Sequence, residues 1–256
     1  MSVELAREGD IATLTLSRPR ALHALDRATL AAMAETLAEL VEDPPRVLLV
    51  ETTGDRVFVA GADIAAMSEM SAEEARSFAR LGHTAFRRLE TLPSIVVAVV
   101  QGAALGGGCE LALACDLVVA SEKARFGQPE TNLGLIPGFG GCSRLQRRVG
   151  VAAARDLIYT GRLIGAQEAS EMGLVSRVWP AEELRDEARK LAEELAARPP
   201  LACMRAKVAM ASAETSDAAS AASVEVEAFA SLFGAEDTAE GLAAFLEKRT
   251  PTFRGR

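Results

Sequence analysis

Two glutamates in glycine-rich segments are the strongest candidates for chemistry in this sequence. Glu110 lies two positions after three consecutive glycines at 106–108, and Glu130 lies in a second segment that is rich in glycine and proline. Consecutive glycines remove every Cβ from the turn, so amide N–H groups at the start of a following helix can face a negative charge. Two carboxylates beside such donors suit proton transfer next to a developing oxyanion.

Two other interpretations of the glycine turn deserve comparison. A strand, a glycine turn and a helix also form dinucleotide sites, but that fingerprint needs a third small residue where this chain has Leu111. Alternatively, the glycines could serve only to let the helix pack closely against the strand, with Glu110 in solvent. Leu111, Leu113 and Ala114 make that helix apolar, which argues against a fully solvated carboxylate.

The four cysteines, Cys109, Cys115, Cys142 and Cys203, form no Cys-x-x-Cys pair, so we expect neither a metal site nor a disulfide framework. Cys109 could be a nucleophile at a helix N-terminus. No base motif accompanies it, and a small buried residue is the preferred interpretation. The sequence has no Gly-x-Ser-x-Gly elbow and no phosphate-binding loop.

The composition excludes some partners. The formal net charge of −8 over 256 residues argues against a general surface for nucleic acid or anionic membranes. Glu110 and Asp116 interrupt the best candidate for a membrane span, and the N-terminus has no signal-peptide pattern. We therefore expect a cytoplasmic protein with reduced thiols.

The order of elements predicts an α/β fold. Alternating apolar residues predict a hairpin from strands at 2–8 and 11–17, and apolar runs predict buried strands at 47–50, 94–100 and 115–120. Helical spacing predicts helices, listed by residue number: 27–41, 71–90, 106–114, 138–149, 151–160, 166–172 and 182–196. The alternation of strands and helices predicts a largely parallel sheet.

The last part of the chain is predicted to be entirely helical. Helices are expected at 201–213, 216–233 and 236–248. Their apolar stripes have no remaining sheet to cover, so a partner subunit is a plausible covering surface.

Four motifs together resemble the crotonase (enoyl-CoA hydratase/isomerase) superfamily. They are Ala-Gly-Ala-Asp-Ile at 60–64, Ala-Leu-Gly-Gly-Gly-Cys-Glu at 104–110, Phe-Gly-Gln-Pro-Glu at 126–130 and Gly-Leu-Ile-Pro-Gly at 134–138. The resemblance covers nearly the whole chain. It implies a spiral of ββα units over residues 1–197 and a helical oligomerisation region over 198–256, which trimerises and often forms a dimer of trimers.

The resemblance also implies an active site. The backbone N–H groups of Ala62 and Gly107 would form an oxyanion hole for the thioester oxygen of an acyl-CoA. Glu110 would activate a water for attack at C3 and Glu130 would deliver a proton to C2, although these roles could be reversed or shared. Glutamates at both positions favour hydration of a 2-enoyl-CoA, as in fatty acid β-oxidation. No cofactor is expected, because CoA is part of the substrate.

Further site residues follow from the same resemblance. The CoA moiety is expected along Arg20, Ala21, Leu22, Ala60, Asp63, Ile64 and Lys248, with Arg18 and Arg249 as further candidates for its phosphates. Lys248 and Arg249 could reach it from a neighbouring subunit. The acyl pocket is expected to include Leu105, Pro137 and Phe139. The chain departs from the family at His23, where asparagine is common, and at Phe139, where a small residue is frequent.

Two other functions remain open from the sequence. A crotonase-fold isomerase, or another acyl-CoA enzyme, would share the fold and the oxyanion hole. A non-catalytic scaffold that binds CoA thioesters would need the binding residues only. The expected partners are an acyl-CoA and further copies of the chain, with neither nucleic acid nor a membrane.

Overall fold

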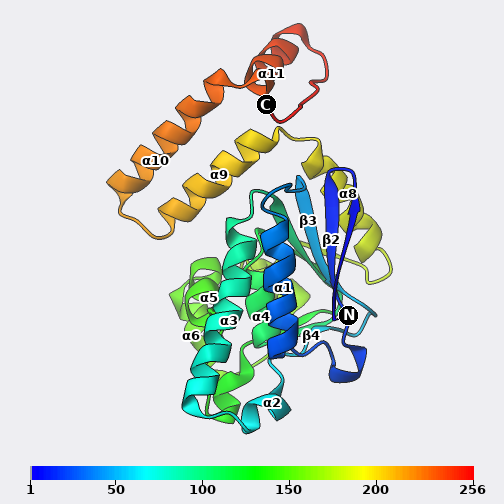
Figure 1. The fold of residues 1–256 in the computed structure, drawn as a ribbon, viewed down its shortest axis with the longest axis vertical. Helices are drawn as coiled ribbons and strands as arrows, with labels where there is room; N and C mark the ends of the chain where they lie inside the picture. Colours follow the sequence, from blue (N-terminus) through cyan, green and yellow to red (C-terminus); the bar gives the residue numbers. More distant parts are fainter. Residues whose placement is uncertain (1) are drawn as a thin grey trace.

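The computed structural model describes residues 2–256, and two β-sheets form its centre (Figure 1). The larger sheet has the order β1-β2-β3-β5-β7-β10 and the smaller has the order β4-β6-β8-β9. The strands are β1 (Val3–Glu8), β2 (Ile11–Leu16), β3 (Val47–Thr52), β4 (Val57–Val59), β5 (Ile95–Val100), β6 (Ala103–Leu105), β7 (Leu117–Ser121), β8 (Arg125–Gly127), β9 (Ile164–Gly165) and β10 (Arg177–Trp179). Only the β1–β2 hairpin is antiparallel in the larger sheet.

The second sheet corrects the prediction of one largely parallel sheet. Each of β3, β5 and β7 leads within a few residues into a short strand of the smaller sheet, β4, β6 and β8 respectively, and helical segments follow. This repetition is the expected spiral of ββα units. The sequence missed β6, β8 and β9, because strands of two or three residues are too short to show a periodicity.

The helical segments cover both sheets and extend beyond them. They are η1 (Pro19–Ala21), α1 (Arg27–Glu39), α2 (Ile64–Ser68), α3 (Ala72–Thr91), α4 (Gly107–Leu113), η2 (Pro129–Leu133), α5 (Gly141–Val149), α6 (Val151–Thr160), α7 (Ala166–Glu171), α8 (Leu184–Ala196), α9 (Pro200–Ala213), α10 (Ala218–Ser231), η3 (Leu232–Gly234) and α11 (Glu236–Glu247). Ser71 and Glu74 form a capping box at the start of α3, and Asp63 caps α2.

One predicted helix begins later than its sequence suggests. Apolar spacing placed its start at residue 138, whereas α5 starts at Gly141. Residues 137–140 form a loop in which Gly140 has a φ of 107°, a conformation that favours glycine. The helix does not extend backwards because this left-handed backbone at Gly140 is incompatible with a right-handed helix.

The core lies on both faces of the larger sheet. The main cluster includes Leu14, Leu48 and Val50 from the strands and Leu37 and Phe86 from α1 and α3. A smaller cluster packs α8 against the opposite face (Figure 1). The sheet is therefore held between helices, as a strand pattern of continuous apolar residues predicts.

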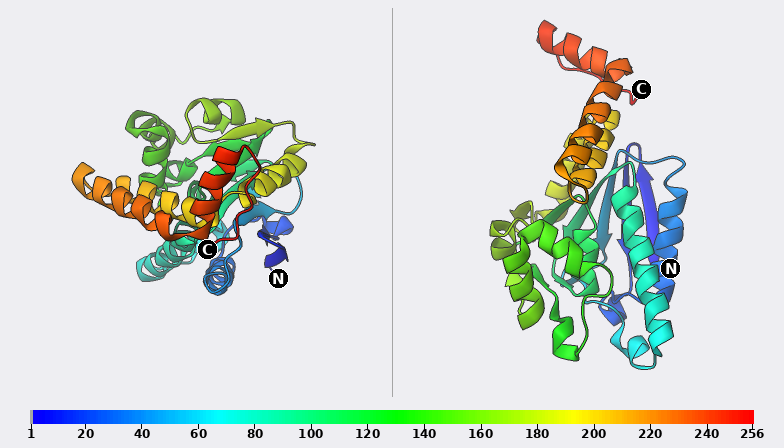
Figure 2. Two further views of the ribbon diagram at one scale, coloured as in Figure 1. Left: turned by 90° about the horizontal axis from the view of Figure 1, so that it is seen from above. Right: turned by 90° about the vertical axis from the view of Figure 1, so that its left-hand side faces the viewer.

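The last three helices extend away from the sheets (Figure 2). No side chain of α9 or α10 is buried, and the two helices pack on each other. From the middle of α9, Lys207 Nζ donates to Asp116 Oδ2 at 2.7 Å. Large apolar side chains are exposed on these helices: Val208, Met210, Val226, Phe229, Phe233, Leu242, Phe245 and Leu246. A single chain leaves this apolar surface uncovered.

Among residues 2–256, no helix has the length and apolar character required to cross a membrane.

Candidate active site

Glu110 lies in the first turn of α4 and is held by the loop before α5. Gly106, with a φ of 49°, ends β6 and begins this helix. The Glu110 side chain is 1% exposed, and its Oε1 atom accepts the N–H groups of Phe139 at 2.8 Å and Gly141 at 2.6 Å. A segment about thirty positions later in the chain therefore fixes the orientation of the carboxylate.

Glu130 lies in η2 and reaches the same glycine turn. A Cβ placed on Gly106 would lie 2.7 Å from Glu130 Oε1. The side chain of Gln128 is buried beside Glu130: in the amide orientation that gives both groups a partner, its nitrogen donates to both Glu130 oxygens, at 3.1 and 3.2 Å. A Cβ on Gly141 would contact both the Gln128 amide and Glu110 Cγ, at 2.6 and 3.0 Å. The two carboxylates therefore converge, as the sequence analysis required.

Gln128 was missed by the sequence analysis. Its position in the Phe-Gly-Gln-Pro-Glu motif, two residues before a candidate acid, was the available signal.

Burial dominates the electrostatics of the pair. It raises the pKa of Glu110 to about 7, even though the Gly141 and Phe139 amides favour the charged form, and the Glu130 charge adds to the rise. Burial also raises the pKa of Glu130. Within residues 2–256, neither acid forms an ion pair. At neutral pH Glu110 is thus divided between its two protonation states, which suits a group that exchanges protons.

The two predicted oxyanion donors lie beside each other. A Cβ on Gly107 would lie 3.4 Å from the Ala62 nitrogen. Gly107 is the first residue of α4, so its N–H has no acceptor in the helix, and the Ala62 N–H has none among residues 2–256. Two neighbouring amides without internal acceptors can stabilise a negatively charged oxygen placed between them.

The loop that carries Ala62 is fixed by the segment after β2. Ala60 N–H donates to Leu22 O at 3.1 Å, and Asp63 N–H donates to Leu25 O at 2.9 Å. These bonds bring six of the predicted CoA-binding residues into two adjoining segments: Arg20, Ala21, Leu22, Ala60, Asp63 and Ile64. Leu22 and Ile64 are more than half exposed, which leaves this surface accessible to a ligand.

Of the three other candidates for phosphate contacts, Arg18 lies at this surface and the other two lie at the C-terminal end of the chain. Arg18 pairs with Asp26 at 2.9 Å and with Asp63 at 3.3 Å, so it also holds the loops together. Arg249 is paired with Glu240 and Glu247, at 2.6 Å each. Lys248 follows α11, on the opposite side of the molecule from α2 (Figure 1). The single chain does not bring Lys248 to the other CoA residues.

The buried cysteine and histidine of the site region are structural. Burial raises the pKa of Cys109, so its thiol stays protonated and is a poor nucleophile. His23 is 5% exposed, and its Nδ1 accepts the Arg18 N–H at 3.1 Å. Burial lowers the pKa of His23, which keeps the ring neutral.

Phe139 packs deeply between α3 and the glycine turn. Its ring makes edge contacts with Phe78 and Phe86, at centroid distances of 5.2 and 5.7 Å. A Cβ on Gly82 would overlap this ring, so the glycine in α3 makes room for it. The opposite edge lies 3.2 Å from where a Cβ on Gly107 would be. The other predicted pocket residues, Leu105 and Pro137, adjoin Gly61 and Gly141.

Comparisons with known proteins agree with this arrangement. The family model described as enoyl-CoA hydratase/isomerase matches residues 6–256. The crotonyl-CoA hydratase of Syntrophomonas wolfei is 44% identical, over 98% of this chain and 97% of its own. The short-chain-enoyl-CoA hydratase of Clostridium acetobutylicum is also 44% identical, over 97% of this chain and 95% of its own.

A solved structure extends the similarity to the fold. The enoyl-CoA hydratase of Bacillus anthracis superimposes with a TM-score of 0.96 at 38% identity, covering 100% of both chains. The C-terminal helices are included in that match. The chain belongs to the enoyl-CoA hydratase/isomerase family.

The buried Glu110 predicts a pH-dependent stability. Folding raises the pKa of the Glu110 carboxyl from 4.5 to about 7. The stability that its protonated form contributes is therefore fully present below pH 4.5 and is lost as the pH rises through 7. The difference in the free energy of unfolding between Glu110→Gln and wild type should therefore shift in favour of the variant as the pH rises from 5 to 8. We expect this shift to be at most roughly 3 kcal/mol. Urea unfolding of both proteins at the two pH values measures this.

Exposed Glu42 provides the control, because Glu42→Gln should shift the free energy of unfolding equally at both pH values. An equal shift for Glu110→Gln would show that burial does not perturb its carboxyl group.

Proposed function

We propose that this protein is an enoyl-CoA hydratase, which adds water across the C2=C3 bond of a trans-2-enoyl-CoA to give a 3-hydroxyacyl-CoA. The convergence of Glu110 and Glu130 beside the Ala62 and Gly107 amides carries this conclusion. The hydratase names of the two 44% identical relatives support it.

The reaction follows from the positions of these groups. The two N–H groups donate to the thioester oxygen, so they polarise the carbonyl and make C3 more electrophilic. They also stabilise the negative charge that grows on this oxygen as C3 is attacked. One glutamate takes a proton from water as the oxygen bonds to C3, and the other gives a proton to C2. We assign the first role to Glu110 and the second to Glu130, and we propose that no cofactor takes part. Water is consumed with no change in net charge.

Replacing either glutamate should abolish most of the turnover. Glu110→Gln and Glu130→Gln each remove a group that transfers a proton, so we expect kcat to fall by about 10²–10⁴-fold. Binding of the CoA thioester should remain. Loss of the conjugated-thioester absorbance of crotonyl-CoA measures turnover, and calorimetry measures binding.

Glu42 is exposed and lies outside the proposed site, so Glu42→Gln should retain wild-type turnover. A wild-type protein that binds crotonyl-CoA without converting it would favour the scaffold function instead. Migration of the double bond in a 3-enoyl-CoA that survives Glu130→Gln would favour an isomerase.

We further propose that Phe139 limits the length of the acyl chain. Its ring fills the space between Gly82 and Gly107, next to the proposed oxyanion donors. An acyl chain that extends towards α3 would have to displace a ring held by Phe78 and Phe86. The short-chain names of the relatives agree with a short pocket.

Shortening Phe139 should therefore broaden the substrate range. We expect Phe139→Ala to raise kcat/KM for a ten-carbon enoyl-CoA, relative to crotonyl-CoA, by about 10-fold, since each buried methylene is worth about 0.8 kcal/mol. Steady-state kinetics with both substrates measure the ratio. Phe253→Ala, in the C-terminal segment, should leave the ratio unchanged. An unchanged ratio in a folded Phe139→Ala protein would contradict the proposal.

The exposed C-terminal helices support self-association, and we propose a homotrimer or a dimer of trimers. Phe229 and Phe245 are 64% and 83% exposed, and neither α9 nor α10 buries a side chain within the chain. Large exposed apolar patches usually mark protein interfaces. A neighbouring subunit would also be the source of any Lys248 contact with CoA.

A charge in this surface should weaken the assembly. We expect Phe229→Glu to lower the molar mass measured by light scattering at micromolar concentration, because a buried unpaired carboxylate costs several kcal/mol. Val41→Glu places the same charge on an exposed apolar residue outside these helices and should leave the mass unchanged. A wild-type monomer would contradict the proposal.

We place this activity in fatty acid β-oxidation and in the cytoplasm. The four cysteines are all free, which agrees with a reducing compartment.

A further inference from the structure

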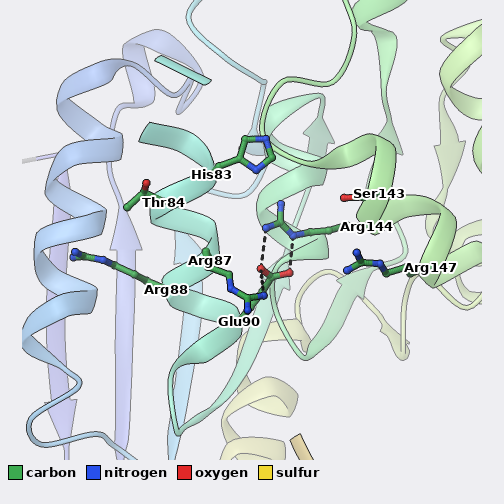
Figure 3. Close-up of a pocket in the computed structure, with 8 residues that line it drawn as sticks. All are labelled: His83, Thr84, Arg87, Arg88, Glu90, Ser143, Arg144 and Arg147. Carbon is green, nitrogen blue, oxygen red and sulfur yellow. Dashed lines mark hydrogen bonds and ion pairs between the residues drawn. The ribbon is translucent and has the colours of Figure 1, made fainter. Parts of the chain in front are cut away.

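An ion pair between Glu90 and Arg144 joins α3 to α5 (Figure 3). Arg144 donates through Nε to Glu90 Oε1 at 2.8 Å and through Nη2 to Glu90 Oε2 at 2.9 Å. The arginine is 9% exposed and the glutamate side chain is 24% exposed. This two-point geometry fixes the plane of the guanidinium group, which a lysine could not reproduce.

The third nitrogen of the guanidinium bonds to the loop at 137–141, which holds Glu110. Arg144 Nη1 donates to the Phe139 carbonyl oxygen at 2.5 Å. The N–H of the same residue, and that of Gly141, donate to Glu110 Oε1 at 2.8 and 2.6 Å. A continuous series of hydrogen bonds therefore runs from Glu90 through Arg144 and Phe139 to the carboxylate.

The loop is shaped around this guanidinium. A Cβ on Gly140 would overlap Arg144 Nη1, and the φ of Gly140 is 107°. The neighbouring Leu135 and Ile136 are 42% and 70% exposed, so packing holds the outer part of the loop weakly. The inner part of the loop is held by the Phe139 ring, by the bond from Arg144 Nη1, and by the Ser143 and Arg144 N–H groups and the Ser143 hydroxyl, which donate to Gly140 O at 3.1, 2.9 and 3.0 Å.

We propose that the Glu90–Arg144 pair is a positioning device for the hydration reaction: it fixes the loop at 137–141, and through it the orientation of the Glu110 carboxylate. This inference rests on the proposed hydratase function. Arg144 acts through the loop backbone and does not touch the substrate. A displacement of about 1 Å at a reacting group can cost about 10²-fold in rate, so a fixed loop has a measurable value.

Other titratable groups lie near both ends of this series of hydrogen bonds. His83 and Arg87 of α3 and Arg147 of α5 lie around the guanidinium. Glu130, Cys109 and Cys142 lie near Glu110. The positive charge of Arg144 lowers the pKa of Glu110 against the effect of burial. Removing that charge should therefore raise the pKa of Glu110 further and move the acidic limb of the pH profile to higher pH.

The test uses full-length variants and crotonyl-CoA. Arg144→Met removes both charge and hydrogen bonds, and we expect kcat to fall by about 10²-fold with KM changed by less than about two-fold. Its acidic limb in kcat/KM should lie at higher pH. Arg144→Lys should keep the limb near its wild-type position and recover part of kcat. Glu90→Gln should lower kcat in the same direction by a smaller factor.

Arg147→Met is the matched control, because Arg147 lies on the same helix and lines the same surface without contacting the loop carbonyl. It should retain the wild-type kcat and pH profile. Thermal unfolding identifies variants that have lost stability, and if Arg144→Met does not fold, Arg144→Lys and Glu90→Gln decide the question.

A role in stability alone would lower the melting temperature and leave kcat and the acidic limb of the folded protein unchanged, which would overturn the proposal. Wild-type protein that does not hydrate crotonyl-CoA would overturn the proposed function, and this inference with it. Wild-type turnover with unaffected variants would overturn the positioning role alone.

Discussion

The bond between the Glu110 carboxylate and the two amides of the loop before α5 is the constraint on which the site depends. A carboxylate that is 1% exposed loses almost all of its hydration, and the Phe139 and Gly141 N–H groups replace part of it. The compensation is incomplete, because the pKa remains raised to about 7. The same residual cost makes the group able to exchange a proton near neutral pH. The contact between Glu110 and these two amides therefore fixes both the shape of the loop and the protonation behaviour of the carboxylate.

The repeated ββα units explain how distant segments reach that contact. Each unit ends a strand in a tight turn, and the parallel pairing of β4, β6 and β8 places these turns beside each other. Ala62 and Gly107 thereby meet from turns more than forty residues apart in sequence, and Glu130 follows the third strand. Glycine is required where these backbones approach: a Cβ on Gly108 would overlap the carbonyl of Val59. The fold thus supplies backbone donors that no side-chain substitution can remove.

The relation between the core and the C-terminal helices is of a different kind. Both faces of the larger sheet are covered within the chain, whereas α9 and α10 bury no side chain. Such helices contribute little to the stability of a single chain, since packing of an apolar face supplies most helical stability in proteins. Self-association would provide that packing, and it would couple the C-terminal segment to the part of the chain that carries the glutamates.

The sequence alone determined which residues are candidates for the chemistry and most of the long elements. Glu110 and Glu130 lie in glycine-rich segments that can be recognised by residue type, and α1 and α3 follow from helical periodicity. The resemblance of four short motifs added Ala62 and Gly107 as candidates for oxyanion donors.

Only the tertiary structure decided how these residues are held. The two-residue and three-residue strands of the second sheet, the later start of α5 and the role of Gln128 depend on pairing between distant segments, which leaves no local periodicity. The carboxylate partners of Arg18 and Arg249 also became visible only in the folded chain. Residue type specifies what a group can do, and folding decides which partner reaches it first, because hydrogen bonds and ion pairs form only between groups that the chain brings within a few ångströms.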